Sequence, residues 1–314
     1  MSSPDRRHAA PPDDASRVRE LLAWASARIR AELADSDPAG SADTPYLDAM
    51  VLLATARGET TERLMASMPD PVDRAARDRF VGFVTQRCSG VPVSYIRGTK
   101  EFFGREFIVS PSVLVPRPET EQLVELALEI ADTITREHAS CEPIHVHDCC
   151  TGSGCVALTV AAERPSLLVT ASDISEAALE VAAANGRVIA PDVAFHRSDL
   201  LETVSRNDSA IAPRPRIITA NPPYLTDTEY ERMRAAEWPE PPEALRAGPD
   251  GLDLIRRLAG EAVTILPRVG YLIVEIGRDQ GEAGCSILRE AGFSSAVVHQ
   301  DLGARDRVLI GITG

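Results

Sequence analysis

No stretch of the sequence reaches 18 consecutive apolar residues, so it predicts no membrane-spanning helix. Its first 15 residues also lack the apolar core of a signal peptide, which predicts a flexible tail on a cytoplasmic protein. Basic residues are the minority, with 33 Lys and Arg against 47 Asp and Glu and a net charge of −14. This balance argues against a direct nucleic-acid ligand, because duplex-binding proteins normally carry a basic face.

Cysteines are few and do not form a metal-binding pattern. Among the six, no pair has the CxxC spacing of common zinc sites, and the lack of a secretory signal favours reduced thiols over a disulfide scaffold. His145, His147 and Cys149 could line one side of a strand, because side chains alternate along it. Small buried thiols beside a glycine-rich turn explain the cysteines more simply, so we predict no metal site.

The remaining composition is that of an ordinary globular protein. Hydrophobic residues make up 44% and charged residues 25% of 314, which excludes a disordered or fibrous chain and allows two domains. After the tail at 1–15, apolar residues recur at helical spacing in three segments, and Asp70-Pro71 is the expected start of the third. This pattern predicts a small helical domain over residues 16–90.

The rest of the sequence predicts a sheet protein. Residues 91–115 hold Tyr, Ile, Phe and Val between glycines, which predicts a linking β-hairpin. Residues 116–314 alternate short apolar runs with helical runs, a βαβ series that predicts a mostly parallel sheet with helices on both faces. The last two strands predict an antiparallel hairpin at the sheet edge. The strands are expected at 144–148, 167–172, 215–220, 270–276, 294–299 and 307–312.

A glycine-rich turn, Cys150-Thr151-Gly152-Ser153-Gly154, follows the first of the parallel strands. Gly152 and Gly154 allow the backbone to approach a ligand closely, and the helix that follows presents free N–H groups. Asp173 ends the next strand, where a carboxylate commonly receives ribose hydroxyls, and Asp199 lies near the end of a third strand. Because the spacing does not fit GxGxxG, the pattern favours an adenosine ligand without phosphates over a dinucleotide.

The segment Asn221-Pro222-Pro223-Tyr224 follows another apolar strand, so it lies at the sheet edge where open α/β sheets bind ligands. Its two prolines fix the backbone and remove two N–H donors. The Asn221 side-chain oxygen and the Pro222 carbonyl can accept both hydrogens of a planar –NH₂ group, and Tyr224 can pack over that group. Such a clamp would hold a weakly nucleophilic amide or aromatic amine against an electrophile, with catalysis by positioning and electrostatics.

These motifs resemble those of the protein-(glutamine-N5) methyltransferases, the HemK/PrmC group, which modify the glutamine of the Gly-Gly-Gln motif in bacterial class 1 release factors. The resemblance covers nearly the whole chain from about residue 16. The tetrapeptide at Asn221 alone is shared with adenine-N6 methyltransferases, and the other motifs make the resemblance more specific. They include Val115-Pro116-Arg117-Pro118-Glu119-Thr120-Glu121, Glu240-Pro241, Asp250-Gly251-Leu252, Glu275-Ile276-Gly277 and Gln280.

The resemblance implies a class I S-adenosylmethionine-dependent methyltransferase: an α/β fold with a Rossmann-like seven-stranded sheet, a small N-terminal helical domain and a linking β-hairpin. It also implies S-adenosylmethionine as the cofactor, a class 1 release factor as the protein substrate docked by the helical domain, and a monomer. The implied reaction is methyl transfer to the glutamine side-chain nitrogen.

The resemblance also assigns roles to individual residues. Cys150 to Gly154 would wrap the methionine part of the cofactor, Asp173 would hold its ribose, and Asp199 with Leu200 would border its adenine. Phe102 and Arg117 would help to close the cofactor site, and Asn221 to Tyr224 would hold the substrate glutamine amide. The implied cofactor site consists of Cys150, Thr151, Gly152, Ser153, Gly154, Asp173, Asp199, Leu200, Asn221, Phe102 and Arg117, and the implied substrate site of Asn221, Pro222, Pro223 and Tyr224, with Asn221, Pro222 and Tyr224 catalytic.

Three segments depart from the family pattern. His145 and His147 lie in a first strand that is mostly apolar in the family, Cys150 stands where many members have Gly, and Ala236-Glu237 replaces an acidic-then-Val pair. Related methyltransferases of a ribosomal-protein glutamine often carry Cys at the turn. The sequence therefore leaves open a ribosomal-protein glutamine, or a drifted small-molecule or protein substrate. A DNA adenine-N6 methyltransferase and a non-catalytic binding module are less favoured.

Overall fold

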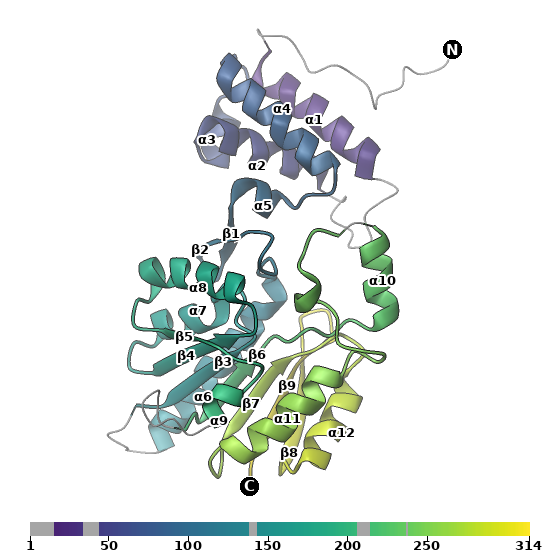
Figure 1. The fold of residues 1–314 in the computed structure, drawn as a ribbon. Coiled ribbons are helices and arrows are strands. Elements are labelled where there is room, and N and C mark those ends of the chain that lie inside the picture. Colours follow the sequence, from purple (N-terminus) through teal and green to yellow (C-terminus); the bar gives the residue numbers. More distant parts are fainter. Residues whose placement is uncertain (1–15, 34–43, 138–142, 206–213, 237) are drawn as a thin grey trace. The chain divides into compact units, whose positions relative to one another are not determined.

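The computed structural model describes residues 16–33, 44–137, 143–205, 214–236 and 238–314 (Figure 1). The chain divides into two compact units. One comprises Met1–Gly98 with Arg232–Pro239, and the other comprises Thr99–Glu231 with Glu240–Gly314. The predicted tail over residues 1–15 and Cys141 lie outside the described residues.

The first unit is helical, with a core formed by the apolar faces of its longer helices. Leu21, Leu53 and Phe80 are fully buried in this core. The prediction that Asp70-Pro71 begins a helix is wrong: the side chain of Asp73 accepts a hydrogen bond from Ala76 N at 3.0 Å and caps the helix instead. The helices are α1 (Val18–Leu33), α2 (Pro45–Arg57), α3 (Thr61–Ala66), α4 (Arg74–Cys88) and α5 (Val93–Arg97).

The second unit begins with a short antiparallel hairpin of β1 (Thr99–Phe102) and β2 (Arg105–Ile108). Phe103 and Gly104 form its turn with φ values of +51° and +70°, the left-handed pair that two-residue hairpins favour. The hairpin is shorter than the predicted range of 91–115, because the residues of α5 form a helix that ends at the left-handed Gly98.

The second unit is built on a seven-stranded sheet with the order β5-β4-β3-β6-β7-β9-β8. β3 to β7 run parallel, while β9 runs antiparallel to both β7 and the edge strand β8. Each of the six predicted strands is confirmed to within two residues at either end. The strands are β3 (His145–Cys149), β4 (Leu168–Asp173), β5 (Ala194–Arg197), β6 (Ile217–Ala220), β7 (Tyr271–Glu275), β8 (Ser295–Gln300) and β9 (Asp306–Ile312).

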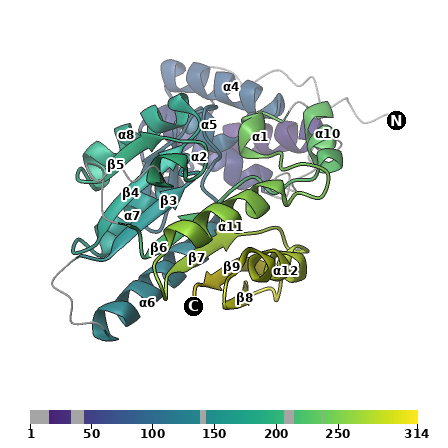
Figure 2. The ribbon, with the colours of Figure 1, turned by 60° about the horizontal axis from the view of Figure 1, so that its bottom comes forward.

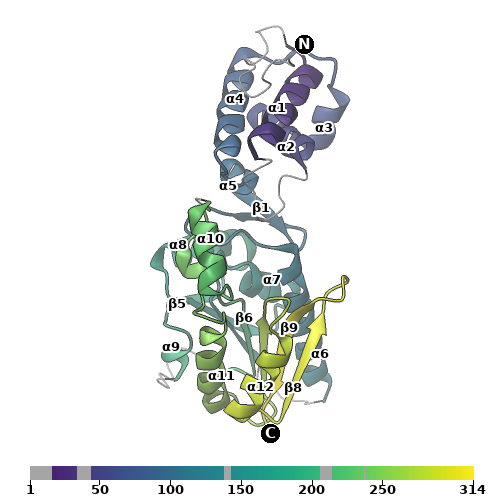
Figure 3. The same cartoon turned by 90° about the vertical axis from the view of Figure 1, so that its right-hand side faces the viewer.

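Helices cover both faces of this sheet, as the βαβ pattern predicts (Figure 2). α6 (Glu121–Glu137) and α7 (Cys155–Glu163) pack on one face, with α8 (Glu176–Ile189) beside α7. α11 (Asp253–Ile265) and α12 (Gly281–Ala291) pack on the other face, and Figure 3 shows α12 against β8 and β9. The shorter helices are α9 (Glu202–Ser205), α10 (Asp227–Ala235), η3 (Pro118–Thr120) and η4 (Pro242–Ala244).

The strand order places a topological switch point between β3 and β6. From β3 the chain adds β4 and then β5 on one side, and it afterwards crosses to add β6 and β7 on the other side. Crossover connections therefore leave the carboxyl ends of β3 and β6 in opposite directions, which opens a crevice between them. The glycine-rich turn follows β3 and Asn221 follows β6, so the fold brings the two predicted motifs to one crevice.

Candidate active site

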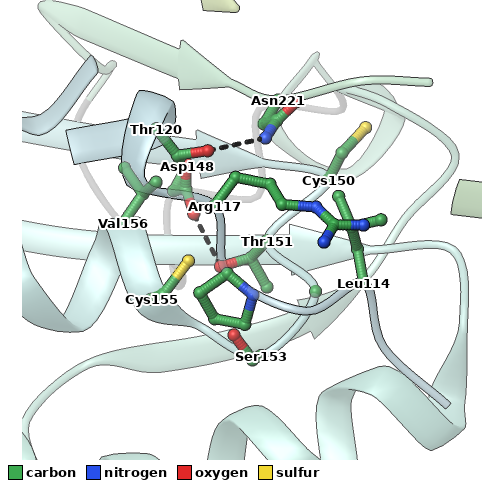
Figure 4. Close-up of a pocket in the computed structure, with 12 residues that line it drawn as sticks. Leu114, Arg117, Thr120, Asp148, Cys150, Thr151, Ser153, Cys155, Val156 and Asn221 are labelled. Atoms are coloured by element: carbon green, nitrogen blue, oxygen red, sulfur yellow. Dashed lines mark hydrogen bonds between the residues drawn. The ribbon is translucent and has the colours of Figure 1, made fainter. Parts of the chain in front are cut away.

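A cavity lies in this crevice and contains about 420 Å³ of empty space, part of it open to solvent (Figure 4). Six of the predicted site residues line it, namely Arg117, Cys150, Thr151, Gly152, Ser153 and Asn221. The other lining residues are Leu114, Pro116, Thr120, Asp148, Cys155 and Val156.

The glycine-rich turn forms one wall of the cavity. Cys150, Gly152 and Gly154 all have left-handed backbones, with φ values of +58°, +53° and +80°. A Cβ atom added at Gly152 would have no protein atom within 4 Å, so the space beside this backbone is open. At Gly154 an added Cβ would lie 3.0 Å from Leu158 and 3.3 Å from Ala182, so this glycine lets α7 and α8 pack closely. The wall is thus bare backbone beside the first turn of α7, whose N–H groups point out of the helix.

Asp173 fixes the turn from the end of β4. Its two carboxylate oxygens accept hydrogen bonds from Gly152 N at 2.9 Å and from Ser175 N at 3.0 Å. Burial raises the pKa of this carboxyl, and the two backbone N–H groups oppose that effect. Asp173 does not line the cavity, but its carboxylate is one hydrogen bond away from the backbone that does.

Asp148, the acid that precedes the turn on β3, lies at the floor of the cavity and was not predicted as a site residue. It accepts hydrogen bonds from the hydroxyls of Thr151 at 2.6 Å and Thr219 at 2.7 Å, which ties the turn to β3 and β6. Burial raises the pKa of Asp148 to about 6, although both hydroxyls favour its charged form. The pattern that could have identified it is an acid near the end of a strand, two residues before a glycine-rich turn.

Asn221 faces the turn from the other side of the crevice, and a chain of hydrogen bonds holds its amide. Asn221 Nδ2 donates to Thr120 Oγ1 at 3.2 Å (Figure 4), and Thr120 Oγ1 donates to Glu275 Oε2 at 2.7 Å. Thr120 and Glu275 are only 2% and 1% exposed. Both belong to motifs that the sequence analysis noted, but neither was predicted as a site residue.

The backbone that carries Tyr224 is held by two distant segments. Gln280 Nε2 donates to the carbonyls of Tyr224 at 3.0 Å and Gly251 at 3.1 Å. A Cβ at Gly251 would collide with the Tyr224 carbonyl, so the chain requires glycine there. Burial raises the pKa of Tyr224 to about 12, which keeps its phenol neutral. Gly251 and Gln280 therefore act as supports for the segment that begins at Asn221.

Arg117 is held on the cavity wall by a buried partner. Its guanidinium donates to Glu240 Oε2 at 2.6 Å, and Val115 N donates to Glu240 Oε1 at 3.0 Å. The Glu240 side chain is 1% exposed, whereas that of Arg117 is 38% exposed. Glu240 thus fixes both the loop and the side chain that border the cavity, a role that sequence reasoning did not identify.

Phe102, Asp199 and Leu200 do not reach the cavity. The Phe102 ring is buried and packs edge-to-face on Phe107, with 6.0 Å between centroids. Asp199 pairs with Arg257 of α11 at 2.9 Å, and Leu200 is a buried residue of the neighbouring core. Four other predicted site residues also do not line the cavity, namely Gly154, Pro222, Pro223 and Tyr224.

The two histidines of β3 are hydrogen-bonded inside the sheet. Both His145 Nε2 and His147 Nδ1 lie 2.8 Å from Thr170 Oγ1, and His147 Nε2 lies 3.0 Å from Ser172 Oγ. Burial lowers the pKa of His147 to about 3, so this imidazole is neutral. Over the described ranges no group of three His, Cys, Asp or Glu side chains is arranged to hold a metal ion.

Comparison with protein families and known proteins agrees with this geometry. Residues 20–98 match the PrmC N-terminal domain family, and residues 132–238 match the methyltransferase small domain family. The alignment with the solved structure of the delta-N METTL16 MTase domain covers 67% of this chain and 89% of that domain, with a TM-score of 0.50 at 14% sequence identity. The fold is therefore that of a class I S-adenosylmethionine-dependent methyltransferase. Among the described helices, none is long and apolar enough to cross a bilayer.

Full-length relatives narrow the family. The release factor glutamine methyltransferase of Neisseria gonorrhoeae is 38% identical over 272 residues, which cover 87% of this chain and 95% of the relative. The release factor glutamine methyltransferase of Bacillus subtilis is 34% identical over 295 residues, which cover 93% and 96%. Since the matches span both units, the chain belongs to the release factor glutamine methyltransferase family.

Proposed function

We propose that this protein transfers a methyl group from S-adenosylmethionine to the side-chain nitrogen of the glutamine in the Gly-Gly-Gln motif of a class 1 release factor. The observation that carries the proposal is the position of the Asn221 amide, which faces the glycine-rich turn across one cavity. Membership of the family supports both the reaction and the release-factor substrate. A cytoplasmic, monomeric enzyme remains the expectation from the sequence.

The residues around the cavity suit S-adenosylmethionine. The bare backbone at Gly152 leaves room for the methionine part, and the Asp173 carboxylate keeps lone pairs for ribose hydroxyls beside its two backbone donors. The carboxylate of Asp148 lines the cavity and, when ionised, favours a cationic ligand over an anionic one. Arg117 would border the entrance in the geometry that Glu240 imposes.

When bound, S-adenosylmethionine supplies an electrophilic methyl group on a sulfonium. In the proposed mechanism Asn221 Oδ1 and the Pro222 carbonyl accept the two hydrogens of the glutamine –NH₂ group and direct its nitrogen at that methyl group. The neutral phenol of Tyr224 packs over the flat amide. The nitrogen forms the new bond while the bond from sulfur to methyl breaks, and the extra proton then leaves the nitrogen for water. The chain contributes positioning and a low-dielectric site, and no strong base is required.

The test follows label from S-adenosylmethionine into protein. The purified enzyme is incubated with a matched release factor and with the same factor carrying Gln→Ala in its Gly-Gly-Gln motif. Label on the first factor alone is the expected result. In N221A we expect the rate to fall by at least about 100-fold, because one of the two acceptors for the substrate –NH₂ is lost. Calorimetry should still detect S-adenosylmethionine binding to N221A.

Two results would redirect the proposal. In a parallel incubation with ribosomal proteins, label there and none on the release factor would favour the ribosomal-protein alternative that Cys150 leaves open. Retained cofactor binding without label on either protein would favour a drifted substrate. Full activity of N221A on the release factor would contradict the assigned role of that residue.

A further inference from the structure

Three polar side chains from distant parts of the sequence, of which Thr120 and Glu275 are buried, form one hydrogen-bonded chain that ends at the substrate-facing amide of Asn221. Glu275 is the last residue of β7, Thr120 the last residue of η3, and Asn221 the residue that follows β6. The two hydrogen bonds of this chain measure 2.7 Å between Thr120 and Glu275 and 3.2 Å between Asn221 and Thr120. All three residues belong to the second unit.

The chemistry of this chain gives it a direction. An ionised carboxylate can only accept, so the Thr120 hydroxyl must give its single hydrogen to Glu275. The oxygen of Thr120 is then an acceptor for Asn221, which must turn its Nδ2 toward Thr120. The two ends of an asparagine amide are nearly equal in shape, so packing alone does not choose between them. The ionised state of Glu275 does choose, because it leaves Nδ2 as the end that can bond.

We propose that Glu275 and Thr120 are positioning residues that fix the Asn221 amide with Oδ1 toward the substrate –NH₂ group. The inference rests on the proposed function and adds to it. The opposite orientation would set Nδ2 hydrogens against the hydrogens of the substrate amide. Two donors would then face each other in a site that needs an acceptor.

The surroundings of Glu275 make its charge costly, which argues that the carboxylate is not there for stability. Burial raises the pKa of Glu275 to about 7, and Glu119 acts in the same direction. Arg307 on β9, Arg117 and the Thr120 hydroxyl oppose that rise. Because this pKa is raised, ionising the carboxyl costs more free energy in the folded protein than in the unfolded chain, a cost that a neutral amide at this position does not carry. A protonated Glu275 can donate to Thr120, so the chain can reverse when the pH falls below about 7.

The kinetic test compares T120V, which cannot form either bond, with T120S, which keeps the hydroxyl, and with E275Q. T264V is the matched control, since Thr264 is an exposed residue of α11 whose hydroxyl bonds only within its own helix. We expect T120V to lower kcat by about 100-fold with KM for S-adenosylmethionine changed by less than about threefold. T120S should recover most of the lost rate.

E275Q separates positioning from a merely structural role. A structural role predicts a lower melting temperature at pH 8, whereas the positioning role predicts an unchanged or higher melting temperature with a reduced kcat. In the wild type, kcat should fall as the pH drops below about 7, and in E275Q this acid limb should disappear. A T120V rate equal to that of T264V, or an E275Q enzyme with the wild-type pH profile, would overturn the inference.

A spectroscopic test works even if the enzyme does not methylate a release factor. It therefore distinguishes a failure of the proposed function from a failure of the inference about Glu275 and Thr120. The chain has three asparagines, Asn185, Asn207 and Asn221, and ¹⁵N labelling of asparagine gives three side-chain NH₂ signals of which N221A lacks one. We expect the Asn221 signal to shift with a midpoint near pH 7 and to lose this shift in both E275Q and T120V. An Asn221 signal that neither E275Q nor T120V moves would contradict the inference whatever the activity.

Discussion

At Gly152 the backbone has a φ of +53° and lines the cavity without any side chain of its own. Glu240 acts on another part of the wall, where its buried carboxylate accepts hydrogen bonds from Arg117 and Val115 N. At the residue scale, the site depends on Gly152, which leaves space because it has no side chain, and on Glu240, which holds neighbouring groups in place by hydrogen bonds. Neither contacts the substrate amide in the proposed mechanism, and both shape the space in which the cofactor would bind.

The change G152A tests the glycine wall. We expect S-adenosylmethionine affinity to fall by at least about tenfold, because the new methyl group occupies open space beside the cavity backbone. The free energy of unfolding should also fall by about 1–2 kcal/mol, since alanine is strained at this φ. Calorimetric titration and urea unfolding measure the two effects.

The matched control is G260A. Gly260 is exposed on α11, has ordinary helical geometry, and a Cβ there would meet no atom within 4 Å. This substitution should raise the free energy of unfolding by up to about 1 kcal/mol and leave cofactor affinity unchanged. Wild-type affinity in G152A would show that the cofactor does not lie against this turn.

Among the elements, strands were predictable and some helices were not. The strands are short apolar runs bounded by turn residues, a pattern that is local in sequence. No range was assigned to helix α12 from the sequence, and its packed face begins with the small residues Gly281, Gly284 and Cys285 and has large apolar residues only at Ile287 and Leu288. An added Cβ at Gly284 would lie 3.0 Å from Leu309, so close packing on β9 explains the glycine that hides the periodicity.

In the candidate site, too, only the parts that local sequence patterns mark could be predicted. The glycine-rich turn and the segment from Asn221 each follow a strand, so their neighbourhood could be inferred from topology. Thr120, Glu240 and Glu275 could not be assigned in that way, because their hydrogen bonds join residues 101 to 155 positions apart. Phe102 was placed at the cofactor by resemblance alone, and the structure buries its ring in the core.

Strand β3 should make the stability of the protein sensitive to acid. Burial lowers the pKa of His147 to about 3, against about 6.5 in an unfolded chain. Between these pH values the unfolded chain binds a proton at His147 that the folded chain does not bind. The contribution of the neutral His147 to the free energy of unfolding is therefore complete above pH 6.5 and is lost as the pH falls. The expected loss is about 1.4 kcal/mol per pH unit below pH 6.

The variant H147Q isolates that contribution. Asp148 and Glu275 have raised pKa values of about 6 and 7 and act with the opposite sign, so only the difference between wild type and variant is diagnostic. Urea unfolding should show that the difference in free energy of unfolding between wild type and H147Q narrows by about 1 kcal/mol from pH 6 to pH 5. A constant difference for H147Q would mean that His147 becomes protonated in the folded protein.

For the whole molecule, the division into two units predicts where ligand binding appears in an unfolding experiment. Every residue that lines the cavity belongs to the second unit. A ligand that binds only the folded state stabilises it by RT ln(1 + [L]/Kd), about 2.7 kcal/mol at 100 times Kd. For a unit of about 200 residues this corresponds to a rise of roughly 5–10 °C in melting temperature.

Differential scanning calorimetry with S-adenosylhomocysteine, the product form of the cofactor, tests this expectation. We expect the transition of the second unit to move upward in the wild type and in N221A, which keeps the turn and Asp173, and to move much less in G152A. If the units unfold in separate transitions, that of the helical unit should stay where it is, because no cavity residue lies in it. An equal shift of both transitions would mean that the helical unit also senses the ligand, and no shift at all would remove the cavity as the cofactor site.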